Sequence, residues 1–91
     1  MTDPNPYSVE FRPSAAKALA KLDGQIRARI LRAITALADD PRPSGVKPLT
    51  GEPGLWRIRV GDYRVVYEIE DDELIVLVVR VAHRSTVYQR R

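Results

Sequence analysis

Hydrophobic and polar positions follow two different periods in the first half of this 91-residue chain. Between Tyr7 and Arg12 every second residue is apolar, which is the period of a strand with one buried face. In the segments Ser14 to Leu22 and Asp23 to Ala38, apolar residues instead recur every three or four positions. Ser14 and Asp23 stand where a side-chain oxygen can cap the first turn of a helix. This half predicts a strand followed by a helical hairpin with one buried stripe.

The second half starts with a stretch rich in Pro and Gly, Asp39 to Gly54, which predicts a surface connection with a short extended piece near Val46 to Leu49. Three β-branched and aromatic segments follow and predict strands: Leu55 to Val60, Tyr63 to Ile69 and Leu74 to Ala82. We therefore expect a single α+β domain over residues 1–91. In it a helical hairpin packs on one face of a mainly antiparallel four-stranded sheet, in the order β-α-α-β-β-β.

Composition narrows the chemistry that the chain can perform. It has no cysteine and one histidine, which excludes disulfides, a catalytic thiolate and metal sites built from thiolates or several histidines. We expect no metal and no other cofactor. The N-terminus has neither a basic start nor an apolar stretch, and the longest strongly apolar run, Leu74 to Val79, ends at Arg80. We expect a cytoplasmic protein without a membrane span.

Charge is distributed unevenly in the second half. The formal net charge of +3 is small, but most acidic residues after Val46 lie between Glu68 and Glu73. The rest of this half is dominated by lysine and arginine, so much of its surface should be positive. This distribution favours a polyanionic partner such as RNA.

The turn Gly61-Asp62 determines how the arginines of the two flanking strands are placed relative to each other. If it joins two strands as a two-residue hairpin, Arg59 lies directly opposite Arg64, with Arg57 diagonal to Arg64 on the face away from the helices. Like charges in this position repel each other, and a bound phosphate would offset the repulsion, because the guanidinium fork matches its oxygens. The alternative is a solvated face with carboxylate partners, for which Glu68 is the nearest candidate. We favour the anion site.

The last strand brings further candidates. With Asp71-Asp72 as the turn, Val79 would face Arg64, so that His83 shares the arginine face and Arg84 points away. A bulge or an odd-length turn would reverse this alternation. A lone histidine is most often a structural donor, but beside arginines the only side chain that titrates near neutral pH becomes a candidate general base.

The segment Trp56 to Tyr67, WRIRVGDYRVVY, followed by Val81 to Arg84 and Tyr88, resembles the RelE-type toxins of bacterial toxin-antitoxin pairs. The similarity extends to the opening strand and to Lys47-Pro48-Leu49, so it covers nearly the whole chain. RelE-like members cut messenger RNA in the ribosomal decoding site, whereas the similar ParE-like members poison DNA gyrase. The resemblance implies a cognate antitoxin and ribosome-bound mRNA as partners, with no direct DNA binding by this chain.

The resemblance also implies a mechanism without metal, in which the ribose 2′-OH attacks the adjacent phosphate and leaves a cyclic phosphate. Arg64 matches the family's arginine on that strand, and Arg84 and Tyr88 match its C-terminal pair. Arg84 would steady or protonate the leaving oxygen. Tyr88 would orient the 2′-OH or stack on a base, although a lone tyrosine there is more often a packing aromatic.

Two arginines depart from the family pattern. Arg57 and Arg59 stand where the best-known RelE-like proteins often have lysines. Because an arginine is effectively always protonated, Arg57 is a poor general base, and we expect it to bind RNA together with Lys47. Arg59 and Arg64 are expected to clamp the charge that develops on the phosphorane. The ribosome could supply proton-transfer groups that the protein lacks.

Two other functions stay open. A ParE-like gyrase inhibitor would bind a protein and cut nothing, and a third possibility is a non-catalytic RNA-binding module. The joint presence of Arg64, Arg84 and Tyr88 argues for the nuclease. We further expect the antitoxin to bring an acidic or amphipathic segment that pairs with the arginines and covers apolar surface of the strands.

Overall fold

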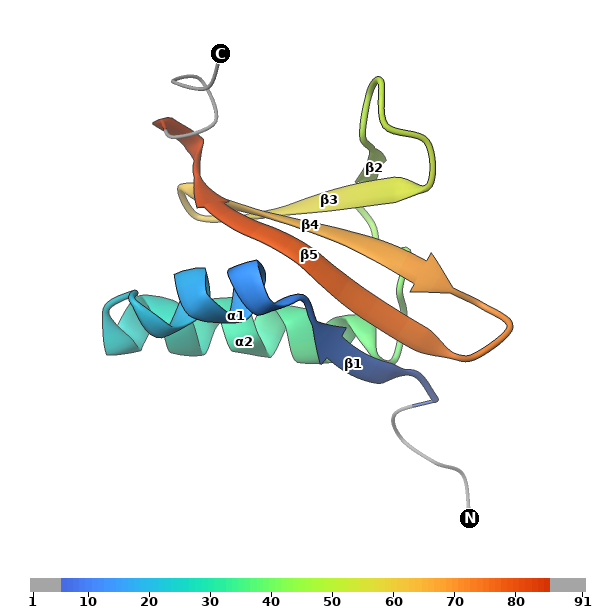
Figure 1. The fold of residues 1–91 in the computed structure, drawn as a ribbon, viewed down its shortest axis with the longest axis horizontal. Coiled ribbons are helices and arrows are strands. Elements are labelled where there is room, and N and C mark those ends of the chain that lie inside the picture. Colours follow the sequence, from blue (N-terminus) through green and yellow to red (C-terminus); the bar gives the residue numbers. More distant parts are fainter. Residues whose placement is uncertain (1–5, 86–91) are drawn as a thin grey trace.

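The computed structural model describes residues 6–85, in which two helices cover one face of a five-stranded sheet (Figure 1). The elements in chain order are β1 (Ser8–Phe11), α1 (Pro13–Ala20), α2 (Gly24–Leu37), β2 (Lys47–Pro48), β3 (Leu55–Val60), β4 (Tyr63–Glu70) and β5 (Ile75–His83). Within the sheet the strands lie in the order β1-β5-β4-β3-β2, and only β1 and β5 are parallel. The α+β class is confirmed. The sheet has a fifth strand because the extended piece in the connection pairs with β3 as β2.

The helical hairpin forms as predicted, with one correction at its start. Asp23 caps α2, because its carboxylate accepts a hydrogen bond from the backbone N–H of Gln25 at 3.1 Å. Ser14 does not cap α1, which begins one residue earlier at Pro13 and has Arg12 at its N-cap position. Proline suits the first helical position because its fixed φ matches the helix and it has no N–H to leave unpaired. Neither helix among residues 6–85 is long and apolar enough to cross a lipid bilayer.

The core lies between the helices and the sheet. Tyr67 is its largest fully buried side chain, and its hydroxyl donates a 2.7 Å hydrogen bond to the carbonyl of Pro41. Burial raises the pKa of Tyr67 to about 12. The other fully buried large side chains are Ile30, Ile34, Leu37, Val65, Val76 and Val78. The Tyr67 bond therefore ties the long connection after α2 to the centre of the sheet.

A β-bulge between β4 and β5 changes which side chains share a face. Val66 pairs with Arg80 and Tyr67 pairs with Val78, so Val79 is an extra residue on β5. Beyond a bulge the alternation of side chains is inverted. The turn between the two strands also holds four residues, 71–74, where the sequence predicted the two-residue turn Asp71-Asp72. Arg64 therefore pairs with Ala82, and the prediction that Val79 faces it is wrong.

A second hydrogen-bonded cluster joins three distant segments around Asp71, in the turn between β4 and β5. Its carboxylate accepts a 2.7 Å hydrogen bond from the Tyr7 hydroxyl and bonds of 3.3 and 2.9 Å from the Arg42 guanidinium. The bonds from Arg42 and Tyr7 hold the pKa of Asp71 below its usual value. The guanidinium of Arg42 also lies 5.4 Å from the Trp56 ring centre. The cluster links the start of β1, the connection and this turn.

We predict that Asp71→Asn lowers the melting temperature at neutral pH by an amount that disappears in acid. The pKa of Asp71 is lower in the folded chain than the value of about 3.9 for an unfolded aspartate, so its stabilisation is present above that value. It is lost as the pH falls through the pKa of the folded state. Thermal unfolding followed by circular dichroism between pH 2 and pH 7 tests this, and a pH-independent difference would contradict it. Asp72→Asn, which removes a charge from the same turn, is the matched control.

Candidate active site

The sheet face opposite the helices carries a cluster of cations drawn from four strands and the end of β5. The strand pairing places these side chains on one face, which we call the arginine face: Lys47, Arg57, Arg59, Arg64, Arg80 and Arg84. Both helices pack on the other side of the sheet and leave this face uncovered within residues 6–85 (Figure 1). Val66 and Ala82 also lie on this face. Val66 is only 4% exposed because it is flanked in register by Arg57 and Arg80.

The hairpin of β3 and β4 sets the centre of the face. Gly61 has a φ of +60° at the first turn position, the conformation that a type II′ turn needs and glycine adopts without strain. The turn puts Arg59 directly opposite Arg64, and Arg57 opposite Val66 one step further along. The predicted opposition of Arg59 and Arg64, with Arg57 diagonal to Arg64, is confirmed. The Arg59 Nε–H donates back to the carbonyl of Gly61 at 3.3 Å, which holds the guanidinium near the turn.

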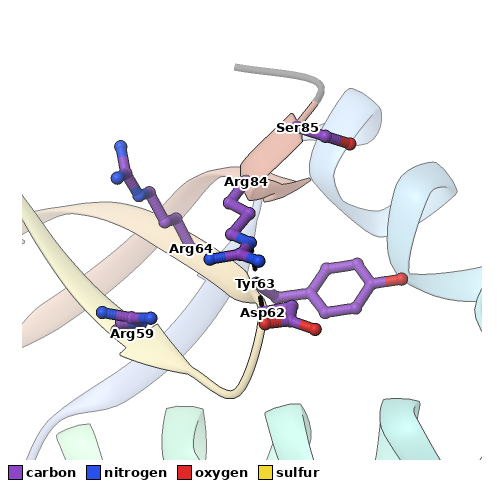
Figure 2. A pocket seen from close by; sticks show the side chains of 6 residues that line it. All are labelled: Arg59, Asp62, Tyr63, Arg64, Arg84 and Ser85. Atoms are coloured by element: carbon purple, nitrogen blue, oxygen red, sulfur yellow. Dashed lines mark ion pairs between the residues drawn. The ribbon is translucent and has the colours of Figure 1, made fainter. Parts of the chain in front are cut away.

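Two cavities share this centre. The first, of about 340 Å³, is lined by Arg59, Asp62, Tyr63, Arg64, Arg84 and Ser85 (Figure 2). The second, of about 330 Å³, is lined by Gly45, Lys47, Arg57, Ile58, Arg59 and Arg64. Because Arg59 and Arg64 line both, the cavities adjoin and form one basic trough. Such a surface suits an extended, negatively charged chain rather than a single small anion.

Arg84 reaches the first cavity from the end of β5. Its backbone N–H donates a 2.9 Å hydrogen bond to the carbonyl of Asp62, and its Nε lies 3.7 Å from the Asp62 carboxylate, an ion pair drawn as a dashed line in Figure 2. The prediction that Arg84 points away from the arginine face is wrong, because the bulge at Val79 reverses the alternation.

His83 lies on the opposite face from the one predicted. It pairs with Tyr63, and the two rings meet edge to face with their centres 5.1 Å apart. The backbone N–H of Ser85 donates to His83 Nδ1 at 3.2 Å, and the Ser85 hydroxyl lies 2.8 Å from the same nitrogen. Nδ1 is thus the acceptor, which places the proton of the neutral ring on Nε2. His83 does not share the arginine face, and its position gives no support to its role as general base.

Arg80 is the residue that sequence reasoning missed. It lies on the arginine face and forms an exposed ion pair with Glu52 at 3.8 Å. The carboxylates near these arginines are thus Glu52 and Asp62, where the sequence pointed to Glu68. The sequence contained a clue to Arg80. Residues an even number of positions apart on a strand share a face, and the resemblance already implied a role for Arg84, which lies four positions after Arg80. Tyr88 lies outside the described residues.

The family model for the ParE toxin of the type II toxin-antitoxin system parDE matches residues 9–88. The chain belongs to the RelE/ParE toxins. It is 38% identical over 87 residues to toxin RelG of Mycobacterium tuberculosis, covering 93% of this chain and 99% of that relative. It is 30% identical over 86 residues to the mRNA interferase toxin RelE of Escherichia coli, covering 90% of each. These names identify a RelE-like toxin of a type II toxin-antitoxin system.

Solved structures of RelE toxins share the fold. The toxin-antitoxin complex RelBE2 of Mycobacterium tuberculosis matches with a TM-score of 0.77 and 36% identity, over 87% of this chain and 99% of that one. The intact RelBE complex of Escherichia coli matches with a TM-score of 0.76 and 28% identity, over 85% of this chain and 95% of that one. Within residues 6–85, no group of three or more His, Asp or Glu side chains is arranged to hold a metal ion.

Proposed function

We propose that this RelE-like toxin is a ribosome-dependent mRNA endoribonuclease in which the ribose 2′-OH attacks the adjacent phosphate without the help of a metal. The observation that carries the proposal is the convergence of Arg59, Arg64 and Arg84 on one cavity, on the sheet face that the two helices leave uncovered. Arg59 and Arg64 stand directly opposite each other, where like charges repel and a bound phosphate would reduce the repulsion. The name mRNA interferase, given to the RelE relative, supports cleavage as the outcome of binding.

Each cation has a role in this reaction that follows from its position along the trough. Arg59 and Arg64 line both cavities, so they clamp the phosphate on which negative charge develops in the transition state. Arg84 steadies the leaving oxygen at one end of the trough. Lys47 and Arg57 line the other end and bind the RNA backbone, which fixes the register of the substrate. Tyr88 stays in the proposal as the group that orients the 2′-OH or stacks on a base.

Inhibition of DNA gyrase is the second candidate, favoured by the match to the ParE family model. A gyrase inhibitor would bind its target and leave mRNA intact. Cell-free translation followed by mapping of mRNA ends separates the two functions, because only a ribosome-dependent nuclease leaves cuts at fixed codon positions.

We predict that Arg59→Ala and Arg64→Ala each lower the single-turnover cleavage rate by about 100-fold or more, as removal of a transition-state donor does. Both side chains project from the sheet away from the helices, so the melting temperature should stay close to that of the wild type. Arg32→Ala removes the same charge from the exposed surface of α2 and should cleave as the wild type does. Wild-type rates at both strand positions would exclude the clamp.

We further infer that a cognate antitoxin inhibits this toxin by covering the arginine face. The structural relatives include complexes of RelE with RelB antitoxins. An acidic segment would pair with guanidiniums that repel one another when the face is empty, and it would block RNA. The expectation that the antitoxin segment also covers apolar surface of the strands has less support. Among the described residues, the exposed large hydrophobic side chains are Leu31 and Leu74, and neither lies on a strand.

Calorimetric titration of the separated antitoxin at two salt concentrations tests this mode of inhibition. Arg59→Ala and Arg64→Ala should each weaken the affinity by roughly twofold to fivefold, the usual contribution of an exposed charge pair. Added salt should weaken binding further, because exposed charges are screened. If neither salt nor the substitutions change the affinity, the antitoxin does not mask the arginines. Inhibition by steric exclusion from the ribosome is then favoured.

A further inference from the structure

A carboxylate lines the same cavity as the three arginines. Asp62 is the acidic residue among its lining side chains, and its side chain is 61% exposed to the cavity and solvent. A negative charge at this point weakens the attraction of the site for phosphate. The carboxylate therefore works against binding, and its presence requires another reason.

The two structural reasons for an aspartate here are weak. The Asp62 carboxylate pairs with Arg84 at 3.7 Å, but both side chains are more than half exposed, and such pairs stabilise little. Arg84 is in any case fixed at the turn by the 2.9 Å hydrogen bond from its own N–H to the Asp62 carbonyl, which any residue provides. The turn itself depends on the positive φ of Gly61. An asparagine would suit the turn as well as an aspartate does and would give up only this weak ion pair.

Among the described residues that line the cavity, Asp62 is the one that can accept a proton. Attack by the 2′-OH requires a base, and the arginines that line the cavity are permanently protonated. His83 lies on the other face, with Nδ1 occupied by Ser85. Tyr63 and Ser85, the remaining lining residues, offer hydroxyl groups that already carry a proton. An ionised carboxylate accepts protons and donates none, so Asp62 alone of these groups fits the role.

We propose that Asp62 is the general base of the cleavage reaction, an inference that rests on the proposed function. The Asp62 carboxylate takes the proton of the 2′-OH as the 2′ oxygen forms its bond to phosphorus. The bond from phosphorus to the 5′ oxygen breaks, and the leaving oxygen takes a proton from water. The resulting hydroxide removes the proton from Asp62, so the products are a 2′,3′-cyclic phosphate and a 5′-hydroxyl end, with no net consumption of water.

The hairpin places this base beside the clamp. Asp62 occupies the turn that joins the strand of Arg59 to the strand of Arg64, and Figure 2 shows its carboxylate next to the Arg84 guanidinium in the same cavity. A phosphate held by the arginines thus brings the neighbouring ribose to the turn.

Asp62→Asn is the decisive substitution, because it removes the charge and keeps the size of the side chain and the backbone hydrogen bond. Single-turnover cleavage of mRNA on programmed ribosomes should fall by about 100-fold to 10,000-fold, the range for loss of a general base. Binding to ribosomes that carry an mRNA with a 2′-deoxy residue at the cut site should stay as tight or become tighter, because a negative charge leaves the arginine cluster. A distorted site would instead lose both cleavage and binding.

A double substitution separates a base from a residue that only positions Arg84. In the Arg84→Ala background, Asp62→Asn should slow cleavage by the same factor as in the wild type. If the effect disappears there, or if Asp62→Asn cleaves like the wild type, Asp62 is not the base and the inference is overturned. A wild-type chain that leaves mRNA intact would overturn the proposed function itself, so the two failures are distinguishable.

Discussion

One extra residue on β5 decides which side chains the last strand contributes to each face of the sheet. Val78 and Val81 are both buried against the helices although they are three positions apart, which a regular strand does not allow. The bulge at Val79 makes this possible. A regular strand would instead direct Arg80 into the core and expose Val81, and burying an unpaired guanidinium is far more costly than interrupting one step of the ladder. The arginine face thus depends on how the core is filled.

The features that the sequence predicted correctly depend on local chemistry. The opposition of Arg59 and Arg64 follows from two turn residues, and the cap at Asp23 follows from one side chain and the N–H groups beside it. The same approach gave the correct fold class and most of the strands. It succeeds because the turn type and the alternation of side chains leave a hairpin little choice of register.

The errors have a different origin. The side on which His83 and Arg84 lie is set by the bulge, and the bulge is selected by packing against helices far away in the sequence. No residue near Val79 in the sequence indicates that a bulge forms there. Ser14 failed as a cap because Pro13 before it is equally suited to start a helix, and β2 is a two-residue strand that exists through its pairing with β3. In each case the local sequence is compatible with two structures, and tertiary contacts determine which of the two forms.

The parallel pairing of β1 with β5 has a consequence for the order in which the molecule assembles. The β3–β4 hairpin closes over two residues, an event on the order of microseconds, whereas Ser8 must find Ile75 across most of the chain. The repulsive arginine pair is therefore brought together early, in a hairpin that has no core of its own and is marginal alone. Arg84 joins only when β5 docks. β5 docks on β4 across a turn of four residues, which is again a local step. The long-range pairing of β1 with β5 therefore closes the sheet after the arginine face has already assembled.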